Sequence, residues 1–158
     1  MLSTQSRLEE GGSDMGYRSD VAYTIRFSDT DKGRQTFEIF LADAKQNEDT
    51  KGAFNEERSE SHPDGCLIID RVKLAINFRA NDVKWYPDYT DVKCHDALIV
   101  LAKEYIHDLV HEDDKGECCM GCIFTIIGEN LDDVQEDAHG EYDWGWIGIR
   151  REILTDWE

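Results

Sequence analysis

The sequence contains little proline and no long apolar run. Its 158 residues include only two prolines, Pro63 and Pro87. No apolar stretch approaches the roughly 18 residues that span a membrane, and the first residues lack the apolar core of a signal peptide. Hydrophobic residues make up 40% of the chain and charged residues 33%, a balance typical of a folded domain. We therefore expect a cytosolic protein.

Basic residues are scarce relative to acidic ones. The chain has 17 Lys and Arg against 35 Asp and Glu, so its formal net charge is -18. Such a surface repels DNA, RNA and anionic lipid, which argues against direct binding of nucleic acid or membranes. It attracts basic surfaces, and grooves that bind nucleic acid are the commonest large ones. High charge can also serve solubility alone, and this alternative stays open.

Recognisable catalytic motifs are absent. The sequence has no phosphate-binding loop, no dinucleotide-binding glycine pattern and no nucleophile elbow. His107 and His111 have the i, i+4 spacing of a metal-binding pair, but the glutamate of the H-E-x-x-H motif is missing. We interpret these two residues as exposed histidines at the end of a helix. The sequence therefore predicts no catalytic residue, no cofactor and no metal, and we classify the protein as a non-enzyme.

The five cysteines do not indicate a disulfide framework, because their number is odd and no secretion signal is visible. Cys119 and Cys122 form a C-x-x-C pair, which can bind zinc or exchange disulfides. Zinc would need further ligands, and the candidates Cys66, His62, Cys94 and His95 lie far away in the sequence. In the strand expected here, Cys119 and Cys122 would point to opposite faces. We expect reduced thiols in the core or at the surface.

Hydrophobic periodicity predicts the order β-α-β-β-α-β-β-β. Alternation from Tyr17 to Phe27 predicts a strand, and an i, i+3, i+4, i+7 pattern from Phe37 to Ala44 predicts a helix, capped within Ser28–Asp31. We expect a loop over 47–65. A strand from Cys66 to Phe78 with Val72 on its apolar face, a turn at 80–82 and a return at 83–86 would form a hairpin.

The second half of the chain continues this pattern. Pro87 would end the preceding strand, and a helix capped by Asp88, Thr90 or Asp91 would end near Val110. Its buried stripe would be Cys94, Leu98, Leu101, Tyr105 and Leu109, widened by Ile99, Ala102 and Ile106. A strand over 118–127 follows, and a strand from Val134 would turn at His139-Gly140 and pair with 144–153. We predict an α+β two-layer sandwich, with two helices on one face of an antiparallel sheet. It would be a ferredoxin-like core plus a C-terminal hairpin, with a disordered tail over 1–14 and a single domain over 15–158.

Acidic residues cluster in the turns after the long helix and in the C-terminal hairpin, close to two tryptophans. Carboxylates spaced around aromatic side chains can imitate nucleic acid to a basic groove. The tryptophans could equally face the core or a homodimer contact. The predicted partner-binding residues are Glu112, Asp113, Asp114, Glu129, Asp132, Asp133, Glu136, Asp137, Glu141, Asp143, Trp144 and Trp146.

Residues 15–22, MGYRSDVA, resemble the opening of a loose family of small, largely uncharacterised phage proteins that begin MGYRSxVA. The similarity continues in patches at 83–87, 126–133 and 146–151. In that family the segment before the acidic loop commonly ends in an aromatic-Ile-Arg-Ile strand, from which Phe124-Thr125-Ile126-Ile127 departs. The resemblance implies a phage accessory protein made in the infected cell, and it implies no particular activity.

Three hypotheses follow. The first is an acidic phage protein that inhibits a host nucleic-acid-handling or defence complex, as anti-CRISPR and anti-restriction proteins do. The second is a small metal-dependent enzyme acting on a nucleotide, with His139 or His62 as the base. The third is an oligomeric scaffold joined through the strand that carries Trp144 and Trp146.

Overall fold

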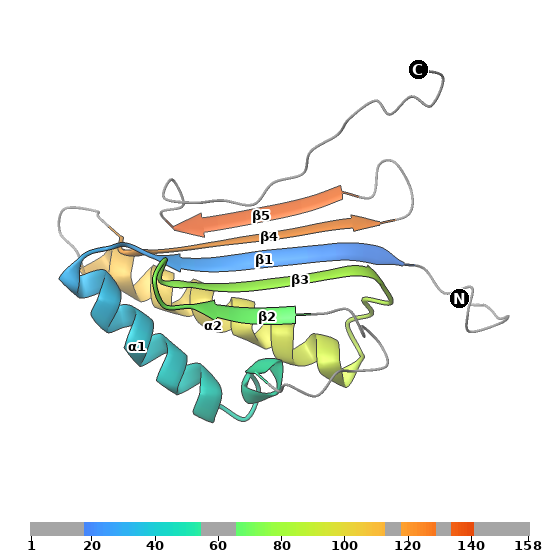
Figure 1. The fold of residues 1–158 in the computed structure, drawn as a ribbon, viewed down its shortest axis with the longest axis horizontal. Helices are drawn as coiled ribbons and strands as arrows, with labels where there is room; N and C mark the ends of the chain where they lie inside the picture. Colours follow the sequence, from blue (N-terminus) through green and yellow to red (C-terminus); the bar gives the residue numbers. More distant parts are fainter. Residues whose placement is uncertain (1–17, 55–65, 113–117, 129–133, 141–158) are drawn as a thin grey trace, which may run out of the picture.

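The computed structural model describes residues 18–54, 66–112, 118–128 and 134–140. They form a five-stranded antiparallel sheet with two long helices packed on one face (Figure 1). The elements are β1 (Ser19–Phe27), α1 (Asp31–Gln46), the 3-10 helix η3 (Lys51–Phe54), β2 (Cys66–Asp70), β3 (Ala75–Val83), α2 (Thr90–Glu112), β4 (Met120–Gly128) and β5 (Val134–Gly140). The predicted α+β sandwich with both helices on one face is confirmed.

The strand order is β2-β3-β1-β4-β5, and every neighbouring pair is antiparallel. A helix follows β1 and another follows β3, which is the split β-α-β arrangement of the predicted ferredoxin-like core. β5 extends this core by pairing with β4. The predicted pairing of β5 with residues 144–153 falls on residues that the structure does not describe.

The core lies between the helices and one face of the sheet. Alternate residues of β1 point toward the helices, and Val21, Tyr23 and Ile25 are almost fully buried there. Phe27, at the end of the strand, packs against Phe37 and Phe40 of α1, with ring centroids 5.3 and 5.8 Å apart. Burial of each such side chain contributes about 1.5–3 kcal/mol.

The predicted boundary of the first hairpin is wrong. The chain turns at Arg71–Leu74, and β3 then runs straight through the predicted turn to Val83. Asp70 explains the early turn, because its Oδ1 accepts hydrogen bonds from the backbone N–H groups of Val72 and Lys73 at 3.1 and 2.9 Å. Leu74 adopts a positive φ of 54°, and Val72 is 93% exposed instead of lying on the apolar face.

Residues 84–86 lie outside the sheet, so the predicted return strand does not exist. Trp85 is half-buried, and its ring lies 5.8 Å from that of Phe78 and 5.7 Å from that of His95. Part of the predicted loop over 47–65 forms the 3-10 helix η3, which packs close to α2. A Cβ added at Gly52 would lie 3.3 Å from the Cβ of Cys94.

The buried face of α2 agrees in part with the predicted one. Leu98, Ile99, Ala102, Ile106 and Leu109 are buried as predicted, whereas Cys94, Leu101 and Tyr105 are only half-buried. The centre of the face is formed by residues at i, i+3, i+7, i+10 and i+14 from Val92. These residues are Val92, His95, Ile99, Ala102 and Ile106. Neither α1 nor α2 is apolar enough over a sufficient length to span a membrane.

Candidate acidic interaction surface

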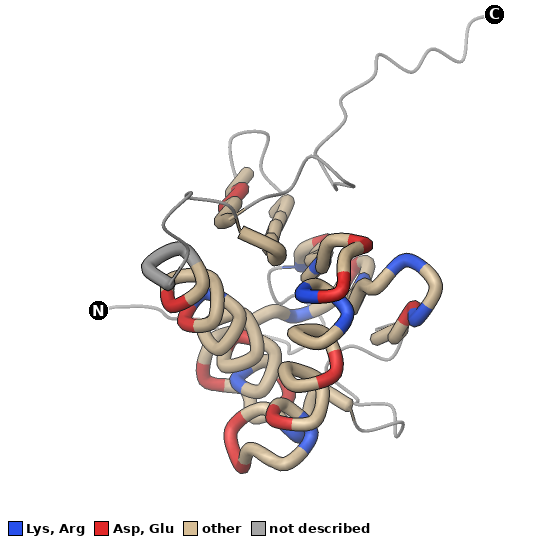
Figure 2. Tube along the Cα trace, turned by 90° about the vertical axis from the view of Figure 1, so that its left-hand side faces the viewer, with Lys and Arg blue, Asp and Glu red and all other residues tan. Residues whose placement is uncertain are grey.

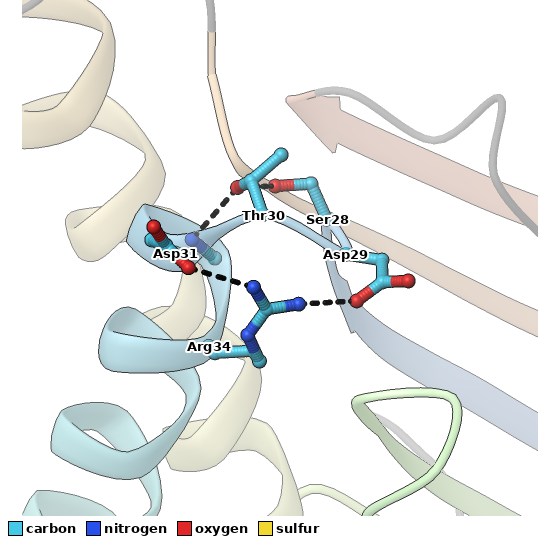
Figure 3. Close-up of polar contacts among 6 residues, drawn as sticks. Ser28, Asp29, Thr30, Asp31 and Arg34 are labelled. Atoms are coloured by element: carbon cyan, nitrogen blue, oxygen red, sulfur yellow. Dashed lines mark hydrogen bonds and ion pairs between the residues drawn. The ribbon is translucent and has the colours of Figure 1, made fainter.

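The acidic residues around the start of α1 are neutralised locally. Thr30 caps the helix, since its Oγ1 accepts a hydrogen bond from the N–H of Gly33 at 3.0 Å. Arg34, one turn later, donates to Asp29 at 2.5 Å and to Asp31 at 2.7 Å (Figure 3). The two carboxylates therefore belong to the helix start and have a cation beside them.

The remaining length of α1 shows the same pattern. Glu38 forms an ion pair with Arg71 of the β2–β3 turn, and the guanidinium of Arg71 also lies 5.8 Å from the ring centroid of Phe37. Just after the helix, Glu48 pairs with Lys51 at 2.9 Å. Exposed pairs of this kind each contribute little to stability, but they leave few free carboxylates on this helix.

The C-terminal half of α2 is different. Glu104 and Asp108 are exposed, and neither forms an ion pair with a described residue. They are spaced i, i+4, so about 6 Å of helix axis separates them on one stripe of the helix. Val100, four residues before Glu104, lies on the same stripe and is 53% exposed. An exposed apolar side chain in line with two free carboxylates is a suitable surface for a basic protein partner.

This arrangement costs the helix stability. Like charges at i, i+4 destabilise a helix by about 0.2–0.5 kcal/mol. Asp108, one turn before the end of α2 at Glu112, also opposes the helix dipole, by at most about 0.3–1 kcal/mol at low ionic strength, whereas Glu104 lies a further turn inside the helix. Glu112, the last residue of α2, continues the spacing of Glu104 and Asp108 in the sequence. The position of these acids is therefore not explained by the stability of α2.

α2 also contacts β5 through charged residues. Lys103 donates a hydrogen bond to Asp137 at 2.8 Å, and His139 Nε2 lies 2.8 Å from the other oxygen of Asp137. The hydrogen bond from Lys103, followed by the charge of His139, lowers the pKa of Asp137. Asp137 is thus half-buried and engaged inside the molecule. Its neighbour Glu136 is exposed on the other side of β5.

Two of the twelve predicted partner-binding residues, Glu136 and Asp137, have described side chains. Glu112 is described only as part of the backbone of α2. The other predicted residues lie outside the described ranges. They are Asp113, Asp114, Glu129, Asp132, Asp133, Glu141, Asp143, Trp144 and Trp146.

The described elements next to these acidic segments lie at two ends of the sheet. Gly121 pairs with Gly140 at one end, where a Cβ added at Gly140 would lie 3.0 Å from Ile106 of α2. Ile127 pairs with Val134 at the other end, about 20 Å away along β5. Residues 141–143 follow the first end and residues 129–133 join the strands at the second. The acidic segments 129–133 and 141–143 are therefore attached at opposite ends of β5.

The net charge is also unevenly divided along the chain. The described residues contain 12 Lys and Arg and 17 Asp and Glu, and the other residues contain 5 and 18. The corresponding net charges are -5 and -13. Acidic and basic positions are interspersed along the described elements (Figure 2). Free carboxylates on the described elements, such as those of α2, are therefore a local feature against a mixed background.

The cysteine pair does not follow the predicted alternation. β4 begins at Met120, so alternation does not extend to Cys119, whose Sγ lies 3.5 Å from Oγ1 of Thr36 in α1. Cys122 lies in β4 near Lys103 of α2, and burial raises the pKa of its thiol to about 12. Both thiols are therefore buried on the helical side, against different helices. A protonated, buried thiol is a poor nucleophile and metal ligand.

The sequence interpretation missed a buried polar pair. The hydroxyl of Tyr23 lies 2.7 Å from Nδ1 of His95, and both side chains are buried. Burial raises the pKa of Tyr23, so the phenol stays protonated and can donate to the imidazole. The spacing of His95 from Val92 and Ile99 was the available signal. Stacking on Phe78, with centroids 4.1 Å apart, makes His95 part of the core.

The described residues contain no group of three or more His, Cys, Asp or Glu that could hold a metal ion. His139, a predicted candidate base, has its Nε2 2.8 Å from Oδ1 of Asp137, and His62 lies outside the described ranges.

The face of the sheet opposite the helices lacks a stacking platform. β1 and its neighbours place Ala22, Thr24, Ile123 and Thr125 at the centre of this face. Ferredoxin-like domains that bind RNA on their sheet use aromatic residues there. No described side chain on this face is aromatic, and the net charge is strongly negative. Recognition of RNA by this face is therefore disfavoured.

No protein-family model, curated protein or solved structure matches the chain.

Proposed function

We propose that this protein is an acidic phage protein that acts in the cytoplasm of the infected host cell. It binds a host protein with a basic nucleic-acid-binding groove, and thereby inhibits a nucleic-acid-handling or defence complex of the anti-CRISPR or anti-restriction target class. It works by presenting a DNA-mimicking negative surface, and it is not an enzyme. The resemblance of residues 15–22 to small phage proteins supports the setting.

The observation that carries the proposal is the pair of free carboxylates on α2. Glu104 and Asp108 are exposed and unpaired among the described residues, at positions where they destabilise their own helix. Asp31 and Glu38 of α1, by contrast, have cations beside them. Carboxylates that cost stability and have no ion-pair partner among the described residues are consistent with selection for an external, basic partner.

The net charge of -18 supports the same function through kinetics. A strongly negative protein is steered toward a positive groove, and the association rate then falls steeply as salt increases. Val100, exposed beside the carboxylates, would supply apolar contact area once the partner is bound. Binding should therefore combine salt-sensitive association with a less salt-sensitive dissociation rate.

The test is capture of host proteins on the immobilised full chain at about 50 and 500 mM salt, followed by competition with double-stranded DNA. A genuine target should be retained at low salt, released by high salt and displaced by DNA. Glu104→Lys/Asp108→Lys should weaken its binding at least tenfold, since each change removes an attraction and adds a repulsion.

The matched control is Glu48→Lys/Asp49→Lys, which makes the same change in net charge beyond the end of α1. It should reduce binding much less, through long-range steering alone. Equal losses in the two double variants would show that overall charge, and not the surface of α2, determines binding. A target that DNA does not displace would contradict the mimicry of nucleic acid.

A further inference from the structure

β2 and β5 form the two edges of the described sheet, and they differ in charge (Figure 1). β5 carries the carboxylates of Glu136 and Asp137 near its centre. Charged side chains on an edge strand discourage pairing with another chain. β2 has the sequence CLIID, in which only the last residue is charged and proline is absent. β2 therefore lacks the features that usually protect an edge strand from pairing.

The side chains of β2 are accessible at this edge. Ile68 points to the sheet face opposite the helices and is 55% exposed. Leu67 and Ile69 point toward the helices and are only half-buried. Their partners on β3, Phe78 and Ile76, are almost fully buried. The remaining exposure of β2 therefore lies on its outer side, where no described strand pairs with it.

The sequence of β2 matches itself when two copies pair antiparallel about Ile68. Directly opposite residues of such a pair lie on the same face of the sheet, with Cβ atoms about 4.5–5.5 Å apart. Ile68 then lies opposite Ile68 of the second copy, and Leu67 lies opposite Ile69 on the helical face. All three central positions pair apolar with apolar side chains. The two-fold axis beside Ile68 is the symmetry that most homodimers adopt.

The charges next to β2 balance one another, which matters in a molecule with a net charge of -18. Glu38 of α1 forms an ion pair with Arg71, the residue after β2. The Oδ1 of Asp70 accepts the two backbone hydrogen bonds of the β2–β3 turn, and Lys73 in that turn adds a positive charge. The charges of these four side chains sum to zero. Two copies can therefore approach at β2 with little local repulsion.

We propose that β2 is a dimerisation edge, at which two copies of this chain pair antiparallel about Ile68 and join their five-stranded sheets into one. β2 has five residues, so strand pairing alone buries less than the roughly 1,200 Å² of a stable complex. The dimer is therefore weak, and its population rises with protein concentration. It uses none of the carboxylates of α2, so it is independent of the proposed inhibition of a host complex.

The test is sedimentation equilibrium of the full chain over about a hundredfold range of concentration, at about 50 and 500 mM salt. We expect a reversible monomer–dimer equilibrium whose dissociation constant falls several-fold at the higher salt, because salt screens the repulsion between two acidic copies. The proposed host complex has the opposite salt dependence, so the two proposals can fail separately. A monomer at every concentration and at both salt levels would overturn the dimer.

Ile68→Lys should weaken dimerisation at least tenfold, because two like charges would lie directly opposite each other on the paired strands. Val100→Lys is the matched control, since it makes the same change in net charge at a residue of α2 that is 53% exposed. It should change the dissociation constant less than twofold. Equal effects of the two variants would overturn pairing about Ile68.

Hydrogen exchange of the unmodified chain, followed by NMR, keeps the test decisive if Ile68→Lys folds poorly. As protein concentration rises, exchange should slow at outward-facing amides of Cys66–Asp70, because they become hydrogen-bonded to the second copy. Amides of Val134–Gly140, on β5, should not change. Protection at β5 instead of β2 would overturn the proposal. Protection of β2 that requires an added host target would also overturn it, in favour of a strand from that target.

Discussion

α1 and α2 cover the same face of one sheet, yet they differ in whether their exposed acidic side chains form ion pairs. Asp31 and Glu38 of α1 form ion pairs with Arg34 and Arg71, and Asp43 accepts a hydrogen bond from Tyr105. α2 is held to the sheet by the buried Tyr23–His95 pair and by Lys103, and its exposed carboxylates form no ion pair within the described part of the chain. The difference indicates that α1 is organised mainly for stability, whereas α2 combines anchoring with an outward-facing acidic surface.

The largest expected effect is at the start of α1. A Cβ at Gly33 would lie 2.0 Å from the carbonyl oxygen of Ser28, a backbone atom that cannot move away cheaply. We predict that Gly33→Ala lowers the free energy of unfolding by about 3 kcal/mol, measured by urea denaturation. Gly52→Ala is the control, since its nearest contact is a side-chain atom at 3.3 Å, and it should cost less than about 1 kcal/mol. Similar costs at the two glycines would contradict this account of α1.

The next effect concerns the anchor of α2. Tyr23→Phe keeps the ring contact with Phe78 but removes the hydroxyl that bonds to His95. We predict a loss of about 1–3 kcal/mol in unfolding free energy, because a buried imidazole nitrogen loses this hydrogen bond. Tyr86→Phe, a half-buried tyrosine outside the core, should change stability by less than about 0.5 kcal/mol. If both variants cost the same, the Tyr23–His95 bond does not anchor α2.

Much of this fold could be predicted because its signals are local. The alternation in β1, the spacing of Phe37, Phe40 and Leu41 in α1, and the caps around Thr30 each lie within a few residues. The prediction of the first hairpin failed because Val72 continues the apolar alternation of the sequence, whereas the side chain of Asp70 ends the strand by accepting a hydrogen bond from the N–H of Val72. A hydrogen bond to the local backbone outweighed the pattern.

For the candidate site, only the negative sign of its charge could be predicted from the sequence. The excess of acid and its clustering are visible in the sequence, but which carboxylates are free depends on contacts between distant residues. Glu38 meets Arg71 33 residues away, and Asp137 meets Lys103 34 residues away. Asp137 and Glu136 therefore seemed equivalent in the sequence. In the fold, Asp137 accepts a hydrogen bond from Lys103, whereas Glu136 is exposed.

A smaller effect tests whether Asp137 is an internal partner of α2. Its pKa is lowered in the folded protein, chiefly by Lys103, so its contribution is present above its unfolded pKa and is lost as pH falls through the lowered value. Lys103→Met should cost less than about 1 kcal/mol near neutral pH, because both side chains are more than a third exposed. The cost should shrink as the pH falls through this lowered pKa and disappear once Asp137 is protonated.

The measurement is urea denaturation across pH, together with an NMR titration of Asp137. In the variant the carboxyl should titrate closer to its ordinary pKa. Lys93→Met, which removes an exposed lysine earlier in α2, is the control and should leave the titration of Asp137 unchanged. A cost in Lys103→Met that stays constant at low pH would indicate lost packing by the lysine stem and not a lost ion pair.

The smallest expected change has the opposite sign and decides the comparison between the helices. Glu104→Gln/Asp108→Asn should raise the free energy of unfolding by a few tenths of a kcal/mol, because it removes a like-charge pair and relieves the helix dipole. Glu38→Gln should lower it by about 0.2–1 kcal/mol, because Arg71 loses its partner. Both are read from denaturation at low ionic strength, where surface charges act most strongly. If neutralising α2 is instead destabilising, Glu104 and Asp108 contribute to the fold, and the reason to assign them an external partner disappears.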